Sequence, residues 1–230
     1  MIKIENPRTY GWMSAVRGMR NPMNSWDKSD SYETHGEYGD QFFFGENDLA
    51  LAKKLTQAGP DHRKFLRQIM VSMDITAPLY WWKEFDTYKV GTVANSCSTM
   101  HKIHEKDLTR EDFSCDMMDE WGLANLDRTI RCLNTDRRMY VDYDNIVGSK
   151  MPKRHYWYQM IQTLPSSYNQ MRTVTMTYEN LLNMYSARKD HKLDEWRKFC
   201  DTVADLPYFN DLIIAKELTN HDKPNPTADA

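Results

Sequence analysis

Charged and aromatic side chains alternate between residues 81 and 89, in the stretch WWKEFDTYK. Neither a plain core nor a plain surface explains this mixture. One interpretation is a pocket for a flat ligand, because tryptophan and tyrosine offer broad apolar rings with a polar edge. The other is a partly buried aromatic helix whose lysines extend along it to reach solvent.

Arg188 lies in the segment NMYSARKDH, beside a helix whose other side is apolar. From this position a guanidinium group could reach inward and form a bidentate pair with a phosphate or a carboxylate. The alternative is an exposed arginine in a charged run with Lys189 and Asp190.

His101 and His104 are three residues apart, a spacing that could present both imidazoles to a metal on one helix face. No third ligand stands at a useful spacing, so we expect two ordinary histidines and no metal site.

The sequence also lacks a glycine-rich phosphate loop, HExxH, Gly-x-Ser-x-Gly and a Cys/His nucleophile signature. The cysteines form no CxxC pair, and we expect four reduced thiols, at Cys97, Cys115, Cys132 and Cys200.

The balance of charge excludes a general nucleic-acid binder. The 230 residues include 30 Lys and Arg against 33 Asp and Glu, a formal net charge of -3, so we expect no polymeric nucleic acid as partner. The amino end lacks the apolar core of a signal peptide, and no apolar run approaches the roughly 20 residues that span a bilayer. We therefore expect a cytoplasmic protein with no membrane contact.

The elements that must position these residues indicate an α+β domain. We expect one domain at 1–218 and a disordered tail at 219–230. Residues 21–46 are rich in Asn, Asp, Ser and Gly and predict a long loop or lid. Hydrophobic periodicity predicts helices at 47–62, 79–90, 125–140 and 178–206, and a half-buried strand at 64–78 that ends at Pro78. In the second helix, Trp81, Phe85 and Tyr88 would form one stripe.

Three stretches resemble the flavin-dependent thymidylate synthases, in the family's order. The segment LPSSYNQMRTVTMTYENLLNMYSAR, residues 164–188, resembles the closing motif and matches it at Leu164, Pro165, Thr175, Leu181, Asn183 and Arg188. The segment MSAVRGMR resembles an early Ser-Ala-Val-Arg-x-x-Arg element and matches it at Ser14, Ala15, Val16, Arg17 and Arg20. Ala77 and Pro78 match the Ala-Pro before the family's signature region. The resemblance spans residues 13–212.

The signature region itself departs from the family. Lys83 and Glu84 stand for its Arg-Gln, while Thr87, Tyr88 and Lys89 stand for its Arg-His-Arg, which helps hold FAD. The resemblance therefore implies that FAD is bound by Thr87, Tyr88, Lys89 and, where the family has a flavin-side asparagine, Thr177. Glu84 is a pure acceptor, which suits an amino group and hence a base such as cytosine better than uracil.

A further stretch, VANSCSTMH, replaces the family's nucleotide-binding segment. Asn95 stands for a glutamate, Cys97 for a serine near the pyrimidine and Thr99 for a phosphate-binding arginine. The loss of that arginine removes a charge-assisted contact of roughly 1.5–3 kcal/mol unless Lys83 or Lys89 compensates. The substrate-binding residues implied by the resemblance are Lys83, Glu84, Asn95, Cys97 and Arg188, and Arg188 is also the implied catalytic residue.

The resemblance implies a central sheet flanked by helices and sites formed between the subunits of a homotetramer. The implied activity transfers a one-carbon unit from methylenetetrahydrofolate to C5 of a pyrimidine deoxynucleotide, dUMP or a related base, with NADPH reducing the FAD. The alternative is a non-catalytic relative that keeps the fold as a nucleotide-binding or protein-interaction module.

Overall fold

The computed structural model describes residues 2–36, 39–146 and 151–214. They form two compact units that the chain enters more than once. The first unit contains residues 1–4, 74–88 and 94–173, and the second contains, as far as they are described, 5–73, 89–93 and 174–230. The predicted tail at 219–230 lies outside the described residues, and the single domain at 1–218 stays a prediction.

Four strands form the main sheet, in the order β1, β4, β6, β5. Their bounds are Lys3–Tyr10 for β1, Met70–Pro78 for β4, Asn169–Thr177 for β6 and Val93–Ser96 for β5. β1, β4 and β6 each contribute residues to both units. A separate pair of antiparallel strands consists of β2 (Tyr32–Gly36) and β3 (Gly39–Phe43).

β4 confirms the predicted alternation and the predicted end at Pro78. Its inner side chains, Val71, Met73, Ile75 and Ala77, are fully buried, and the residues between them are half-buried. The predicted start at residue 64 was wrong. Residues Lys64–Arg67 form a short 3₁₀ turn, η3, which buries Phe65 and Leu66 before the strand begins.

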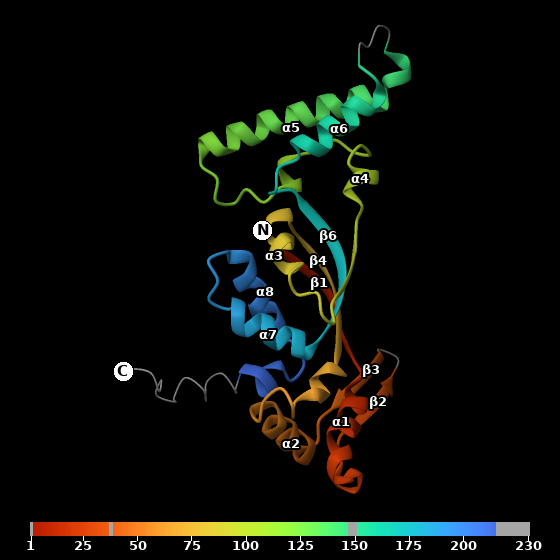
Figure 1. The fold of residues 1–230 in the computed structure, drawn as a ribbon, viewed down its shortest axis with the longest axis vertical. Helices are drawn as coiled ribbons and strands as arrows, with labels where there is room; N and C mark the ends of the chain where they lie inside the picture. Colours follow the sequence, from red (N-terminus) through yellow and green to blue (C-terminus); the bar gives the residue numbers. More distant parts are fainter. Residues whose placement is uncertain (1, 37–38, 147–150, 215–230) are drawn as a thin grey trace, which may run out of the picture. The chain divides into compact units, whose positions relative to one another are not determined.

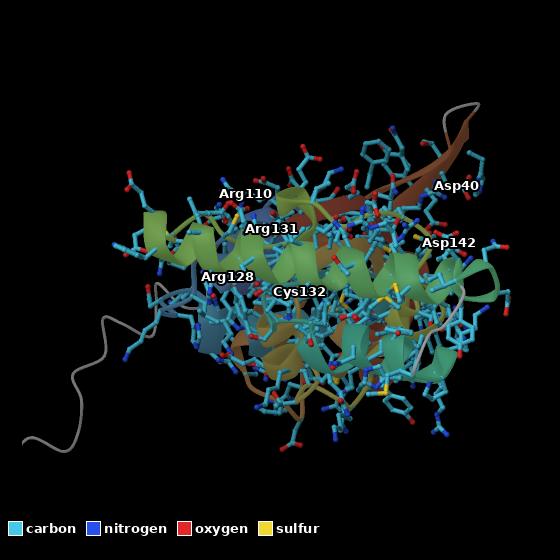
Figure 2. All side chains as sticks on the ribbon, turned by 90° about the horizontal axis from the view of Figure 1, so that it is seen from above. Asp40, Arg110, Arg128, Arg131, Cys132 and Asp142 are labelled. Atoms are coloured by element: carbon cyan, nitrogen blue, oxygen red, sulfur yellow. The ribbon has the colours of Figure 1, made fainter. Side chains whose placement is uncertain are left out.

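The first unit is mainly helical outside the sheet. It contains α3 (Leu79–Phe85), α4 (Thr99–Lys102), α5 (Glu120–Val141), α6 (Lys153–Thr163) and the turns η4 (Arg110–Asp112) and η5 (Tyr143–Asn145). α5 and α6 lie side by side (Figure 1). The predicted apolar face of α5, Leu126, Ile130 and Leu133, is buried in one cluster with Met160 of α6. Figure 2 labels Arg128, Arg131 and Cys132, which are exposed along α5.

The predicted helix at 79–90 ends earlier, at Phe85. The backbone carbonyl of Glu84 accepts hydrogen bonds from the Thr87 N–H, at 3.1 Å, and from the Thr87 hydroxyl, at 2.7 Å. The hydrogen bond from the Thr87 hydroxyl occupies a carbonyl of the last turn, and such side-chain bonds compete with the backbone hydrogen bonds that would continue the helix. Tyr88 therefore lies beyond α3, and the predicted stripe contains only Trp81 and Phe85.

The second unit contains four helices among its described residues. They are α1 (Trp12–Arg20), α2 (Glu46–Gln57), α7 (Tyr178–Arg188) and α8 (Asp194–Ala204), with shorter turns η1 (Asn21–Met23), η2 (Trp26–Lys28) and η6 (Asn210–Ile214). α2 confirms the predicted helix before the Gly59–Pro60 stop. The prediction of one long helix at 178–206 was wrong, because α7 and α8 are separated by a turn.

That turn carries no glycine or proline, so residues 189–193 contain no signal for a helix break. Its backbone is instead satisfied by side chains. Arg197 of α8 donates to the carbonyls of His191, at 2.6 Å, and Lys192, at 3.4 Å, and the His191 ring accepts from the Leu193 N–H at 3.2 Å. Polar groups around a turn can replace helical hydrogen bonds in this way.

The predicted loop at 21–46 contains a hairpin, which corrects that prediction in part. β2 (Tyr32–Gly36) pairs with β3 (Gly39–Phe43) in antiparallel register. Aromatic stacking stabilises it: Tyr32 lies 5.1 Å from Phe43 across the hairpin, and Phe42 lies 5.1 Å from Trp12 of α1, between ring centres. Whether the segment closes over a ligand stays a prediction.

Helices and a central sheet in one chain confirm the predicted α+β class. No helix among the described residues combines the length and the apolar character needed to cross a membrane.

Candidate functional site

The first unit carries the predicted residues of α3 and β5. Trp81, Trp82 and Phe85 are at most 1% exposed, so the aromatic side chains of α3 form core. Lys83 is exposed and, within the described residues, has no hydrogen-bond or ion-pair partner. The interpretation of a packed helix with solvent-reaching lysines therefore fits α3, and Lys83 remains an unpaired cation beside it.

Arg172 of β6 lies directly on this aromatic core, and the sequence analysis missed it. Its guanidinium carbon is 4.2 Å from the centre of the Trp82 ring, and its Nη1 donates to Asp86 Oδ1 at 2.8 Å. The Trp82 indole N–H in turn donates to the backbone carbonyl of Gln170 at 2.9 Å. An arginine over a desolvated indole is a strong form of cation–π contact. β6 alternates polar and apolar residues only from Thr173 to Thr177, so the sequence holds no periodic signal for Arg172.

Gln170 connects this contact to the segment after β5. Its Oε1 accepts from Arg172 Nε at 3.0 Å, and its Nε2 donates to the Cys97 carbonyl, at 2.9 Å, and to Thr99 Oγ1, at 3.1 Å. The Cys97 N–H also donates to the Met171 carbonyl at 2.9 Å. Thr99, for which the resemblance implies a family arginine that binds phosphate, is therefore held against β6.

The other predicted residues of the first unit differ in exposure. Asn95 and Cys97 are exposed, and so is Thr87, while Glu84 and Tyr88 are half-buried. All four cysteines are free. His101 is exposed, and His104 lies 5.0 Å from Tyr140 between ring centres. Within the described residues, no group of three or more His, Cys, Asp or Glu side chains could hold a metal ion.

In the second unit, Thr177 is the N-cap residue directly before α7, and its hydroxyl is already hydrogen-bonded. Thr177 Oγ1 accepts from the Asn180 N–H at 3.2 Å and donates to Asn180 Oδ1 at 2.7 Å, while the Thr177 N–H donates to the same Oδ1 at 3.1 Å. This is a capping box, which satisfies backbone groups at the start of a helix. Thr177 has a structural role, and its role toward the cofactor stays a prediction.

Asn180 also fixes the segment that follows Lys89. Its Nδ2 donates to the Val90 carbonyl at 2.7 Å. The φ of Gly91 is +73°, and a Cβ atom there would lie 3.0 Å from Asn180 Oδ1, so a side chain at this position is disfavoured both by the backbone conformation and by the close contact. Lys89 is exposed and unpaired within the described residues.

Arg188, the predicted catalytic residue, is half-buried at the last position of α7. Its guanidinium carbon lies 4.9 Å from the centre of the fully buried Trp196 ring, and its Nη1 is 2.9 Å from His191 Nε2. The side chain therefore packs on an aromatic ring, which fits the inward orientation and not the exposed alternative. Its role toward a nucleotide stays a prediction.

The two arginines of the early motif have different environments. Arg20 is buried, and its Nε donates to Asp48 Oδ1 at 2.5 Å. Arg17 is exposed, lies 5.3 Å from the Trp26 ring centre and lines a pocket of about 320 Å³ with Ser14. The buried ion pair gives Arg20 a structural role, although both arginines line this pocket.

Asp48 is a fully buried carboxylate with several donors. Ser29 and Ser31 donate hydroxyls to Oδ2, at 2.8 and 2.7 Å, and the N–H groups of Asp30 and Ser31 donate to the same oxygen. Burial alone would raise the pKa of Asp48, but the hydrogen bonds from Ser31, Ser29 and Arg20 outweigh it and hold this pKa below its ordinary value.

The comparison with known structures supports the resemblance at the level of the fold. No protein-family model and no curated protein matches the sequence. A crystal structure of thymidylate synthase X (ThyX) from Helicobacter pylori with FAD and dUMP matches with a TM-score of 0.64 and 15% identity, over 94% of this chain and 99% of that one. A second structure of the H. pylori enzyme, also with FAD and dUMP, matches with a TM-score of 0.61 and 15% identity, over 92% and 97%. The chain has the fold of a flavin-dependent thymidylate synthase.

Proposed function

We propose that the protein is a flavin-dependent enzyme that transfers a one-carbon unit to C5 of a pyrimidine deoxynucleotide. The observation that carries this proposal is the match of nearly the whole chain to nearly the whole of a ThyX subunit that binds FAD and dUMP. The retained Arg188 and Arg17 support it. Methylenetetrahydrofolate would supply the carbon unit, NADPH the hydride, and the active species would be a cytoplasmic homotetramer of single-domain subunits.

The residues present fit FAD, even though Thr87, Tyr88 and Lys89 stand for the family's Arg-His-Arg segment. Lys89 is an exposed ammonium group without a partner among the described residues, so it can pair with a phosphate oxygen of FAD. Lys83, which is also exposed and unpaired there, would do the same for the phosphate of the nucleotide. Tyr88 is half-buried and offers a ring against which a flat group can stack. FAD, when bound, supplies the hydride chemistry, and the protein supplies position and charge around it.

This chain's own residues would then act on the nucleotide. Arg188 would donate hydrogen bonds to the pyrimidine and stabilise negative charge on it, because its guanidinium lies over the Trp196 ring and does not lose its proton. Glu84 would accept a hydrogen bond from the base. Asn95 and Cys97, both exposed, would contact the sugar and base.

One observation favours a second function, a non-catalytic nucleotide-binding or protein-interaction module. Thr99 replaces a phosphate-binding arginine, and its hydroxyl is bonded to Gln170. Replacement of a phosphate-binding arginine by threonine would lower the affinity for the nucleotide and leave the fold unchanged.

Flavin fluorescence tests both functions. We expect saturable quenching when purified protein is added to FAD, and we expect dUMP or dCMP to change it. Turnover with methylenetetrahydrofolate and NADPH then identifies the enzyme and its base. FAD binding without turnover on either nucleotide would favour the module, and growth of a strain lacking thymidylate synthase, without thymidine, would exclude it. The absence of FAD binding at high protein concentration would contradict the enzyme.

A further inference from the structure

Four side chains of the first unit form a continuous hydrogen-bonded line, which we call the Arg172 network: Asp86, Arg172, Gln170 and Thr99. It joins the end of α3 to the start of α4 across β6. Its contacts are 2.8 Å from Arg172 to Asp86, 3.0 Å from Arg172 to Gln170 and 3.1 Å from Gln170 to Thr99.

The chemistry of the partners fixes the direction of every bond. Arginine only donates, so the Gln170 oxygen must face Arg172 and accept. The Gln170 amide nitrogen must then face the other way, where the Cys97 carbonyl can only accept. Thr99 Oγ1 therefore accepts from Gln170, which leaves the hydroxyl proton of Thr99 for an acceptor elsewhere.

Arg172 is itself held in a rigid place. Its side chain is 15% exposed, and its guanidinium carbon lies over the ring of Trp82, a residue that is 1% exposed. An arginine that is stacked and paired loses most of its rotamer freedom, so its partner Gln170 is also held in one orientation.

We propose that Arg172 and Gln170 are positioning residues that orient the Thr99 hydroxyl as a hydrogen-bond donor toward the phosphate of the bound nucleotide. This inference rests on the proposed function for its ligand and on the geometry of the first unit for its mechanism. A neutral donor thus takes the place of the family's arginine charge at residue 99. Nucleotide binding should therefore depend less on ionic strength than it would with an arginine–phosphate pair.

A double-mutant cycle measured by dUMP titration tests the proposal. In the otherwise native protein, we expect Thr99→Val to raise the Kd for dUMP about tenfold, because one oriented hydrogen bond is lost, and Thr99→Ser to keep the native Kd. In a Gln170→Leu background, we expect Thr99→Val to change Kd less than about twofold, because the hydroxyl is no longer oriented. Equal effects of Thr99→Val in both backgrounds would overturn the proposal.

Amide hydrogen exchange of the peptide spanning residues 94–102 provides a readout that needs no ligand. We expect Gln170→Leu and Arg172→Met to lower the protection of the Cys97 N–H roughly fivefold to tenfold, since the segment loses its side-chain contacts with β6. Thr173→Val is the matched control: it removes the 2.6 Å bond from Thr173 to Asp74 on the same strand and leaves the network intact. Unchanged exchange in both network variants would overturn the positioning role.

The two readouts separate this inference from the proposed function. If the native protein binds no dUMP, the proposed function fails and the ligand role of Thr99 fails with it. The exchange result still decides whether Arg172 and Gln170 position the segment. If dUMP binds and the effects of Thr99→Val and Gln170→Leu on Kd are additive, the proposed function stands, but Gln170 does not orient the Thr99 hydroxyl toward the nucleotide.

Discussion

The guanidinium group of Arg188 lies over the indole ring of Trp196, at 4.9 Å from its centre. Arg188 ends α7 and Trp196 belongs to α8, so this contact joins the two helices across the turn that separates them. The residue expected to bind the nucleotide is thus also part of the packing between two helices.

We expect Arg188→Gln to weaken dUMP binding by at least about tenfold, because a charge-assisted contact to the base is lost. The accompanying loss of the contact with Trp196 should cost only about 1 kcal/mol of folding stability. Isothermal titration with dUMP and urea unfolding measure the two effects. Arg128→Gln, at an exposed site on α5, is the control. Native nucleotide affinity in Arg188→Gln would remove Arg188 from the site.

The Arg20 and Asp48 pair gives a prediction about stability. We expect Asp48→Asn to lower the free energy of unfolding by about 3 kcal/mol, because Arg20 would remain buried with a neutral partner. Urea unfolding measures this. The comparison is Lys53→Gln, which breaks the more exposed 2.6 Å pair with Asp211 and should cost less than about 1 kcal/mol. Similar losses of unfolding free energy in the two variants would contradict the prediction that the buried pair of Arg20 and Asp48 matters more than the exposed pair.

Asp48 also predicts a dependence of stability on pH. Its pKa is lower in the folded protein than the ordinary value of 3.8, so the folded state binds fewer protons than the unfolded state near that value. The resulting stability is present above pH 3.8 and is lost as the pH falls through the lower, folded pKa. We expect the urea midpoint to fall more steeply on acidification below pH 4 in the native protein than in Asp48→Asn. Parallel curves would contradict this assignment.

Thr177 allows the structural and cofactor roles to be separated. We expect Thr177→Val to destabilise the protein by about 1 kcal/mol, because the capping box of α7 is lost, and Thr177→Ser to keep it. Thermal unfolding measures the stability, and flavin fluorescence measures FAD affinity in the same variants. If Thr177→Val leaves FAD affinity unchanged at a temperature where it is folded, the cofactor role is wrong.

The sequence predicted the elements with strong periodicity and missed those decided by tertiary contacts. The alternation of β4 and the apolar face of α5 were read correctly because burial on one side leaves a direct pattern. The break between α7 and α8 was missed because Arg197 and His191 satisfy the turn without glycine or proline. The hairpin at 32–43 was missed because its stacking partner for Phe42, Trp12, lies far away in the sequence.

The site was predicted by resemblance, residue by residue, and the structure supplies what such a comparison omits. Arg172 and Gln170 lie in the segment that resembles the closing motif but at none of its matched positions, and their importance arises only from their contacts with Trp82 and Thr99. Conversely, Thr177 and Arg20 match or replace motif residues, yet their hydrogen bonds are with Asn180 and Asp48. Side-chain partners of this kind cannot be read from spacing.

The pairing of β4 with β6 has a consequence for how quickly the chain can fold. Thr173 bonds Asp74 and Thr175 approaches Ser72, contacts between residues 99 and 103 positions apart. A long stretch of chain must therefore be synthesised before the two central strands can meet, and closing so large a loop costs entropy before any contact compensates it. Refolding should accordingly take milliseconds to seconds rather than microseconds, and β4, apolar on one face, is exposed to aggregation until β6 arrives.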